Sequence, residues 1–157
     1  MCIVLVEPEI PPNTGNIARL CAATDTELHL VEPLGFRLDD ATLRRAGMDY
    51  WRQVRWRRWR SWREFAEAGG AERCWFIEQG APRSHAEVSY APDDGLVFGR
   101  ETAGLPATLL ETHRDRWVSI PMRNPAARSL NLANCAAIVL YEALRQQGFP
   151  ASPGATR

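Results

Sequence analysis

The sequence predicts an α/β fold in which a mostly parallel sheet carries helices on both faces. Short continuous apolar runs, such as IVLV at 3–6 and CWFI at 74–77, are typical of strands that are buried on both sides. Helix-like segments separate these runs along the chain, and this alternation is the pattern that builds parallel sheets. A chain of 157 residues with 45% hydrophobic and 24% charged residues suits a single domain, which we expect to span residues 1–157.

The predicted elements follow one another through short connections. Strands are expected at 3–6, 28–31, 74–77, 96–98 and 118–120, and helices at 41–46, 61–68 and 106–111. Pro8, Pro11 and Pro12 predict an extended loop after the first strand, because proline disfavours helix at the residue before it. Asn13 or Thr14 is then the expected N-cap of the next helix. The proline-containing tail at 148–157 is expected to be frayed.

The last helix is apolar around its whole circumference. Between residues 132 and 141 only Asn134 is polar. A surface helix of a monomer would show an apolar stripe instead. Two interpretations stay open: a helix in the centre of the core, or a helix that packs one face on the sheet and the other on a second subunit.

The cysteines and histidines indicate neither disulfides nor a metal. Four cysteines lie far apart without C-x-x-C spacing, so we interpret them as free, buried thiols in a reducing compartment (Cys2, Cys21, Cys74 and Cys135). The three histidines are not near them in sequence, which argues against zinc. We expect a cytoplasmic protein without a membrane span, since residues 1–6 are too short for a signal segment and no apolar run reaches roughly 18 residues.

Charge and motifs narrow the possible functions. The net charge is zero, so the whole molecule does not attract RNA, although all 19 basic residues are arginines, which grip phosphate and stack on bases. No G-x-G-x-x-G or Walker A pattern is present, which argues against nicotinamide or nucleoside-triphosphate enzymes. The absence of G-x-S-x-G argues against a serine hydrolase.

Two apolar runs near the C-terminus stop at Gly99 and Pro121 and open into polar loops. Because open α/β sheets bind ligands beyond the carboxyl ends of their strands, these loops are a candidate site. The first loop holds Arg100 and Glu101; alternatively it is only a turn in which Gly99 and Gly104 supply positive φ.

The second loop leads into the last helix. Ser129 is the expected N-cap of that helix. Arg128, Ser129 and Asn131 would together place a cation, a hydroxyl and an amide at a helix N-terminus, where polar or anionic ligands bind.

Four tryptophans are interspersed with arginines in the segment WRQVRWRRWRSW at 51–62. Aromatic residues among arginines suit stacking on unpaired bases and contact with phosphates, which would involve Arg57, Arg58 and Arg60. The other interpretation is a strand and loop whose tryptophans pack inward while the arginines face solvent.

The segments at 8–24, 96–106 and 120–148 resemble the three motifs of the SPOUT methyltransferases, in the same order. The resemblance covers nearly the whole chain and is greatest to the small enzymes that methylate the ribose 2′-oxygen of the tRNA wobble nucleotide, a cytidine or modified uridine. It implies a C-terminal trefoil knot, S-adenosylmethionine as methyl donor without a metal, and a homodimer formed through the last helix.

The resemblance also implies roles for residues. Cofactor contact falls to four positions (Ile77, Gly99, Ile120 and Ser129), and catalysis to four (Arg19, Glu101, Ser129 and Asn131). Arg19 would stabilise a developing 2′-oxyanion or grip a phosphate, because a guanidinium rarely loses its proton. RNA contact is expected from Arg128 on the same ground, and from Arg57, Arg58 and Arg60 on the pattern of tryptophans and arginines alone. Two alternatives remain, a related enzyme acting on ribosomal RNA and a catalytically silent RNA-binding dimer.

Overall fold

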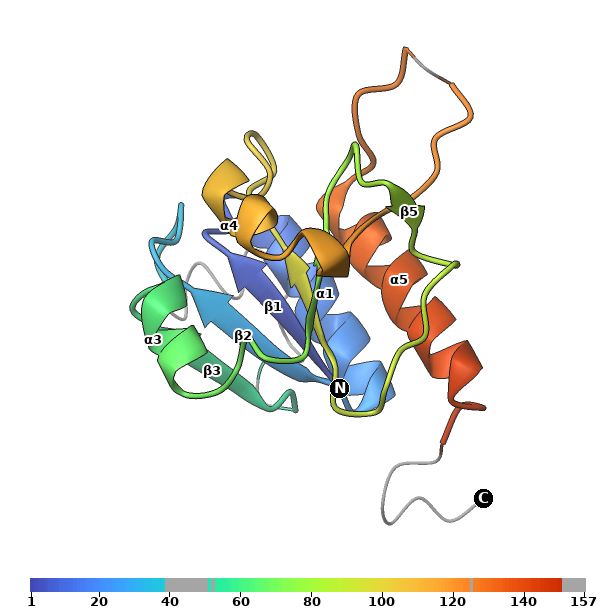
Figure 1. Ribbon diagram of the computed structural model, residues 1–157. Coiled ribbons are helices and arrows are strands. Elements are labelled where there is room, and N and C mark those ends of the chain that lie inside the picture. The colour runs from blue at the N-terminus through green and yellow to red at the C-terminus, as the bar shows by residue number, and fades with distance from the viewer. Residues whose placement is uncertain (39–50, 52, 125, 151–157) are drawn as a thin grey trace.

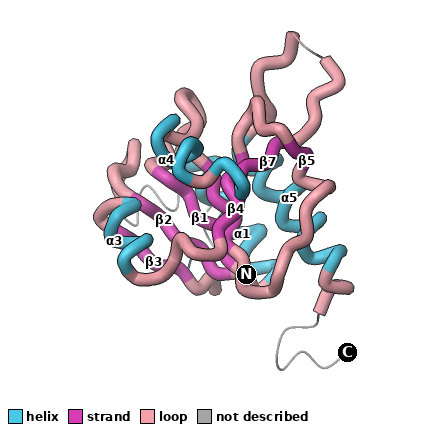
Figure 2. The backbone as a smooth tube through the Cα atoms, viewed as in Figure 1, coloured by secondary structure: helices cyan, strands magenta, loops and turns pink. Residues whose placement is uncertain are grey.

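The protein is built on one seven-stranded parallel sheet (Figures 1 and 2). The computed structural model describes residues 1–38, 51, 53–124 and 126–150. The strand order is β3-β2-β1-β6-β4-β7-β5, and the strand pairs in the described residues are all parallel. The strands are β1 Cys2–Val6, β2 Glu27–Val31, β3 Trp56–Trp59, β4 Cys74–Ile77, β5 Arg83–Ser84, β6 Gly95–Phe98 and β7 Trp117–Ser119. The predicted parallel α/β fold is confirmed.

Helices cover both faces of the sheet, as predicted (Figure 1). They are α1 Pro11–Thr24, α3 Trp62–Glu67, α4 Ala107–Thr112 and α5 Leu132–Gln146, with a 3-10 turn, η2, at Arg114–Arg116. The alternation of side chains along β1 divides the core into two layers. Ile3 and Leu5 pack on the side of α1 and α5, whereas Val4 and Val6 pack on the side of α3 and α4.

Some predictions fall outside this description. The helix expected at 41–46 and the terminal part of the tail, 151–157, lie outside the described residues. The trefoil knot stays a prediction.

The start of α1 differs from the prediction. Pro11 and Pro12 are its first residues, and Ile10 is the N-cap without a side-chain hydrogen bond. Asn13 and Thr14 are buried inside the first turn, so the predicted cap and the extended loop through Pro12 are wrong. Proline is tolerated here because the first N–H groups of a helix have no acceptor within it.

The last helix has one buried face and one exposed face. Ala136, Val139 and Leu140 are fully buried against the sheet, whereas Ile138 and Tyr141 are 39% and 49% exposed. The interpretation of α5 as a central core helix is therefore wrong. A large apolar surface is left uncovered by the single chain.

The tryptophans around β3 pack inward, so the structural interpretation is confirmed for them. Trp59 Nε1 donates to His29 Nδ1 at 2.9 Å. Phe65 lies between the rings of Trp59 and Trp62, with centroid distances of 5.5 and 5.2 Å. Trp56, at the other end of β3, packs its ring 4.5 Å from that of Trp51. These four half-buried rings therefore contact other aromatic side chains of the protein.

All four cysteines are free thiols. Cys21 and Cys74 are buried as predicted, and burial raises their pKa to about 12. Cys2 and Cys135 are only half-buried. Within the described parts of the chain, no helix is long and apolar enough to cross a membrane, and no three His, Cys, Asp or Glu side chains gather as metal ligands would.

His29 makes the stability of the fold depend on pH. Burial lowers its pKa below the ordinary value of 6.5, opposed by the nearby Glu27 carboxylate. Because the unfolded chain then takes up the proton more readily, stability should fall as pH drops below 6.5, by at most about 1.4 kcal/mol per pH unit. Urea unfolding of the wild type and His29→Gln between pH 8 and 5 measures this. The difference in unfolding free energy between the two proteins should shrink as pH falls; parallel curves would contradict it.

Candidate active site

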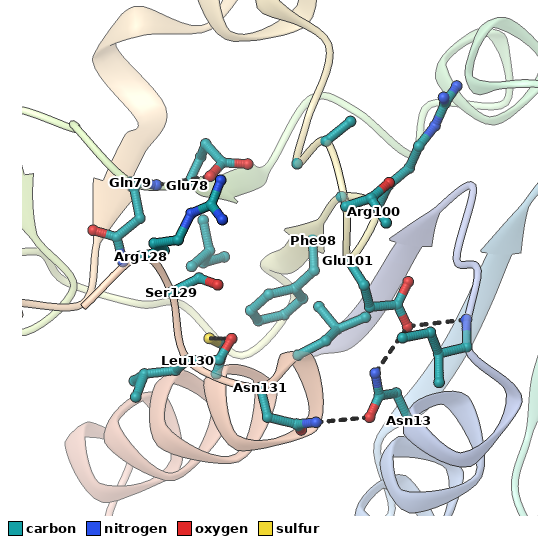
Figure 3. Close-up of a pocket in the computed structure, with 18 of the residues that line it drawn as sticks. Asn13, Glu78, Gln79, Phe98, Arg100, Glu101, Arg128, Ser129, Leu130 and Asn131 are labelled. Atoms are coloured by element: carbon teal, nitrogen blue, oxygen red, sulfur yellow. Dashed lines mark hydrogen bonds between the residues drawn. The ribbon is translucent and has the colours of Figure 1, made fainter. Parts of the chain in front are cut away.

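A cavity of about 740 Å³ opens at the carboxyl ends of β4, β6 and β7 (Figure 3). Ile77 ends β4, Gly99 follows β6 and Ile120 follows β7, and all three line the cavity. The remaining lining residues come from the loops after these strands and from the starts of α1 and α5. The cavity thus lies at the two polar loops where a site was expected, and the start of α1 also lines it.

The loop after β6 is folded back on itself. Arg100 N donates to Gly104 O at 3.1 Å, and Gly104 N donates to Arg100 O at 2.9 Å. Gly104 has a φ of 67°, as expected for a turn glycine. Gly99 is required for another reason: a Cβ there would lie 2.2 Å from the carbonyl carbon of Gly104. The missing side chain lets the backbone of Gly104 and Leu105 pack directly against Gly99, which fixes the shape of the loop beside the cavity.

Glu78 anchors this loop to β4. Sequence reasoning missed Glu78 as a site residue, because only its position directly after a strand pointed to the site. Its Oε2 accepts a hydrogen bond from Leu105 N at 2.8 Å, and its Oε1 accepts one from Gln79 N at 2.9 Å. A Cβ on Gly104 would meet Glu78 Oε2 at 2.1 Å. The carboxylate thus packs directly against Gly104 and holds the loop through its hydrogen bond to Leu105 N.

Glu101 holds the start of α1. Its carboxylate accepts hydrogen bonds from Glu9 N at 2.8 Å, Ile10 N at 3.2 Å and Asn13 Nδ2 at 3.0 Å. A carboxylate is favoured at a helix N-terminus, where N–H groups lack partners. Because its oxygens already accept these bonds, Glu101 is suited to positioning the helix rather than to taking a proton.

Asn13 and Asn131 extend this contact to the third motif. Asn131 Oδ1 accepts from Ala133 N and Asn134 N at 2.9 and 3.3 Å, so Asn131, and not the predicted Ser129, is the N-cap of α5. Its amide is thereby oriented, and Nδ2 donates to Asn13 Oδ1 at 2.8 Å. We call Glu101, Asn13 and Asn131 the three-motif network (Figure 3). Asn13 was missed as a site residue because its position before an apolar helix looked like a cap.

Ser129 and Arg128 lie across the cavity from Glu101 (Figure 3). Both are exposed. Because Asn131 caps α5, the Ser129 hydroxyl is not used as a cap and is available to a ligand. Cys135 also lines the cavity, but burial, reinforced by Glu78, raises its pKa to about 11, so it is a neutral thiol and not a nucleophile.

The remaining predicted residues are not at this cavity. Arg19 is exposed on α1, six residues beyond Asn13 and so about 9 Å further along the helix axis. Arg57, Arg58 and Arg60 lie on or after β3, which is separated from β6 by β2 and β1.

Two of these three arginines contact carboxylates at opposite ends of β2. Arg57 Nε lies 3.1 Å from Glu27 Oε1 at the start of β2. Arg58 Nε donates to Glu32 Oε1 at 2.6 Å, just beyond the end of β2. Two of the three are therefore already paired with carboxylates.

Known proteins resemble this chain over nearly its whole length. The model of the SpoU rRNA Methylase family matches residues 1–141. The tRNA (cytidine(34)-2'-O)-methyltransferase of Saccharophagus degradans is 51% identical over 153 residues, covering 96% of this chain and 97% of the relative. The enzyme of the same name from Escherichia coli is 48% identical over 149 residues, covering 94% of each chain.

Solved structures share the fold. One described as giving structural insights into the 2-OH methylation of C/U34 on tRNA is 42% identical, with a TM-score of 0.86 over 93% of this chain and 95% of that one. An AdoMet-bound rRNA methyltransferase from Sinorhizobium meliloti is 25% identical, with a TM-score of 0.78 over 91% of this chain but only 55% of the other. This chain belongs to the SpoU rRNA methylase family.

Proposed function

We propose that this protein transfers a methyl group from S-adenosylmethionine to the ribose 2′-oxygen of the wobble nucleotide of tRNA, a cytidine or modified uridine. The observation that carries the proposal is the convergence of three motif loops on one cavity at the carboxyl edge of the sheet. Relatives that match over nearly their whole length are named for this reaction at cytidine 34. We place its action in the cytoplasm, as a single domain without a metal.

The cavity fits S-adenosylmethionine. Its volume of about 740 Å³ lies within the range of roughly 300–1,000 Å³ that is usual for small-ligand sites. Backbone near Gly99 and the apolar side chains of Ile77 and Ile120 suit an adenosine moiety. When bound, this cofactor supplies a sulfonium methyl group that an oxygen nucleophile can accept. Ser129 would hold the cofactor or the 2′-hydroxyl.

The contribution of the protein to catalysis is positioning and charge stabilisation. Glu101 and Asn131 keep the starts of α1 and α5 in place beside the cavity by accepting their N–H groups, and Arg19 would stabilise an oxyanion that develops on the 2′-oxygen. Holding the ribose and the methyl donor in line lowers the entropic part of the barrier. Arg128, at the cavity rim, would bind an RNA phosphate. RNA contact by Arg57, Arg58 and Arg60 stays a prediction.

A homodimer through α5 is part of the proposal. The exposed side chains of Ile138 and Tyr141, with Phe149 packed 6.1 Å from the Tyr141 ring, form an apolar surface that a second copy would cover. Because α1 packs beside α5, a partner seated there lies next to α1. We therefore assign Arg19, which does not line the cavity of its own chain, to the cavity of the partner subunit.

Two rival functions are distinguishable. The ribosomal RNA enzyme that shares this fold is only 25% identical and matches along 55% of its length, which favours tRNA over ribosomal RNA. A catalytically silent RNA-binding dimer would not bind the cofactor.

The proposed function predicts cofactor binding and a specific product. Calorimetry should show S-adenosylmethionine binding that Gly99→Val abolishes, because the new side chain would overlap Gly104. Incubation with tRNA should then give 2′-O-methylation at the wobble nucleotide, detected by mass spectrometry of nuclease fragments. Binding without wobble methylation would refute the proposed substrate, and no cofactor binding would favour the silent dimer.

The dimer is tested on the exposed face of α5. Ile138→Asp and Tyr141→Glu should convert dimer to monomer without unfolding the chain, because both side chains are exposed in the single subunit, while a buried unpaired charge costs several kcal/mol at an interface. Analytical ultracentrifugation at micromolar concentration measures this. Thr108 is exposed on α4, on the opposite face of the sheet from α5, so Thr108→Glu is the matched control and should stay dimeric. A monomeric wild type would contradict the interface.

Arg19 should act across the dimer. Arg19→Ala should lose methylation yet keep cofactor affinity, because it lies outside the cavity. Mixing Arg19→Ala subunits with Gly99→Val subunits should restore about a quarter of wild-type activity. Half of randomly paired dimers contain one subunit of each kind, and one of the two sites in such a dimer is complete. Loss of cofactor binding in Arg19→Ala would overturn this division of roles. Failure of mixing to restore activity would show that Arg19 does not act on the partner.

A further inference from the structure

Arg100 stands at the rim of the cavity with its guanidinium turned outward. It lines the cavity through its position after Gly99, but its side chain, 42% exposed, extends away from the interior (Figure 3). There it forms an ion pair with Glu7, which follows β1. The cation therefore lies outside the cavity, on the side where α1 begins.

Glu7 is held in place by the end of the sheet. Its backbone has a φ of 55°, in the left-handed region that few residues other than glycine adopt. Its N–H donates to Val31 O at 2.8 Å, which ties this turn to β2. Strained backbone of this kind persists only where the surroundings enforce it, and it concentrates at functional sites. The Glu7 carboxylate is thus a fixed partner for a flexible arginine.

This side of the rim is acidic. Glu9 Oε2 accepts from Thr102 N and Thr102 Oγ1 at 3.0 and 2.7 Å, and Glu101 accepts from N–H groups at the start of α1. These donors are uncharged, so they do not neutralise the two carboxylates. Among the described residues that line the cavity, Arg100 is the one cation on this side, and Arg128 lies across the cavity (Figure 3).

An RNA substrate would need that cation. A ribose that enters the cavity leaves its two neighbouring phosphates outside, and phosphate contacts set the register of a nucleic acid on a protein. Arg100 and Arg128 stand on opposite sides of the opening. Without Arg100, RNA on the α1 side would meet three carboxylates.

We infer that Arg100 binds an RNA phosphate adjoining the methylated nucleotide and exchanges its Glu7 partner for that phosphate. The inference rests on the proposed function, and it names a substrate-positioning residue of that same site. The exchange is inexpensive because an exposed ion pair contributes little to stability. Arginine also gains from it, since its planar fork can donate two parallel hydrogen bonds to phosphate.

The effect on tRNA binding of changing Arg100 and of changing Glu7 distinguishes a phosphate contact from a purely structural ion pair. Arg100→Gln should weaken tRNA binding about tenfold at low salt, because hydrogen bonds to charged groups are the strong ones. It should also reduce the slope of log affinity against log salt by roughly 0.7–0.9. Glu7→Gln should leave binding equal or tighter, because it releases Arg100. If the ion pair only supports the loop, both variants should weaken binding alike.

Fluorescence anisotropy with unmodified tRNA across a salt series measures these slopes, with calorimetry for S-adenosylmethionine and a melting curve for each variant. Arg100→Lys keeps the charge and should retain the slope, which separates lost charge from a damaged loop. Arg63→Gln is the matched control, since Arg63 Nε pairs with Glu67 at 2.9 Å on α3, and should bind as wild type. Cofactor affinity should not change in any of the four variants.

An unchanged salt slope in Arg100→Gln, or equal losses in Arg100→Gln and Glu7→Gln, would overturn the inference. Because binding needs no turnover, a wild type that binds tRNA but does not methylate it would overturn the proposed function while these slopes still decide the role of Arg100. A wild type that does not bind tRNA would overturn both.

Discussion

The site depends on the three-motif network. Glu101, Asn13 and Asn131 come from segments separated by 88 and 118 residues along the chain, and hydrogen bonds of 3.0 and 2.8 Å join them. Each member has a second task at a helix start: Glu101 accepts N–H groups before α1, and Asn131 caps α5. The contacts between these distant segments therefore bring the starts of both helices together at the cavity.

The parallel sheet decides where the network can form. Since the described strand pairs are all parallel, the loops after β1, β4, β6 and β7 emerge at one edge. Close packing between them is possible because Gly99 and Gly104 lack side chains where any Cβ would collide with backbone or with Glu78. The same edge carries the positive ends of α1 and α5 and a rim of carboxylates. A ligand at this edge thus meets negative charge on its α1 side, where the Glu101 carboxylate already accepts the N–H groups before the helix.

The elements that the sequence predicted well are those with a local cause. Continuous apolar runs located β1, β4 and β6 to within a residue, because a strand buried on both faces must be apolar at nearly every position, and shorter runs interrupted by His29 and Ser119 located β2 and β7 equally closely. The helix expected at 61–68 is present as α3, and Ser61 is its cap, with its hydroxyl accepting from Glu64 N. Prediction was wrong at Pro11 and Ser129, where two structures were locally possible. Proline can end an extended loop or begin a helix, and beside the start of α1 the N–H of Glu9 is bound by Glu101, which lies 92 residues further along the chain.

By itself the sequence determined the fold class, the two polar loops and the residue types at the site, since these follow from hydrophobic pattern and strand ends. Only the tertiary structure decided what each site residue does. Glu101 accepts the N–H groups before α1 because that helix starts against it, and Asn131 rather than Ser129 is the cap of α5, with its amide bonded to Asn13. Tertiary contacts likewise gave Arg57 and Arg58 carboxylate partners and left Arg100 at the rim. Such roles depend on partners distant in sequence, which no local pattern encodes.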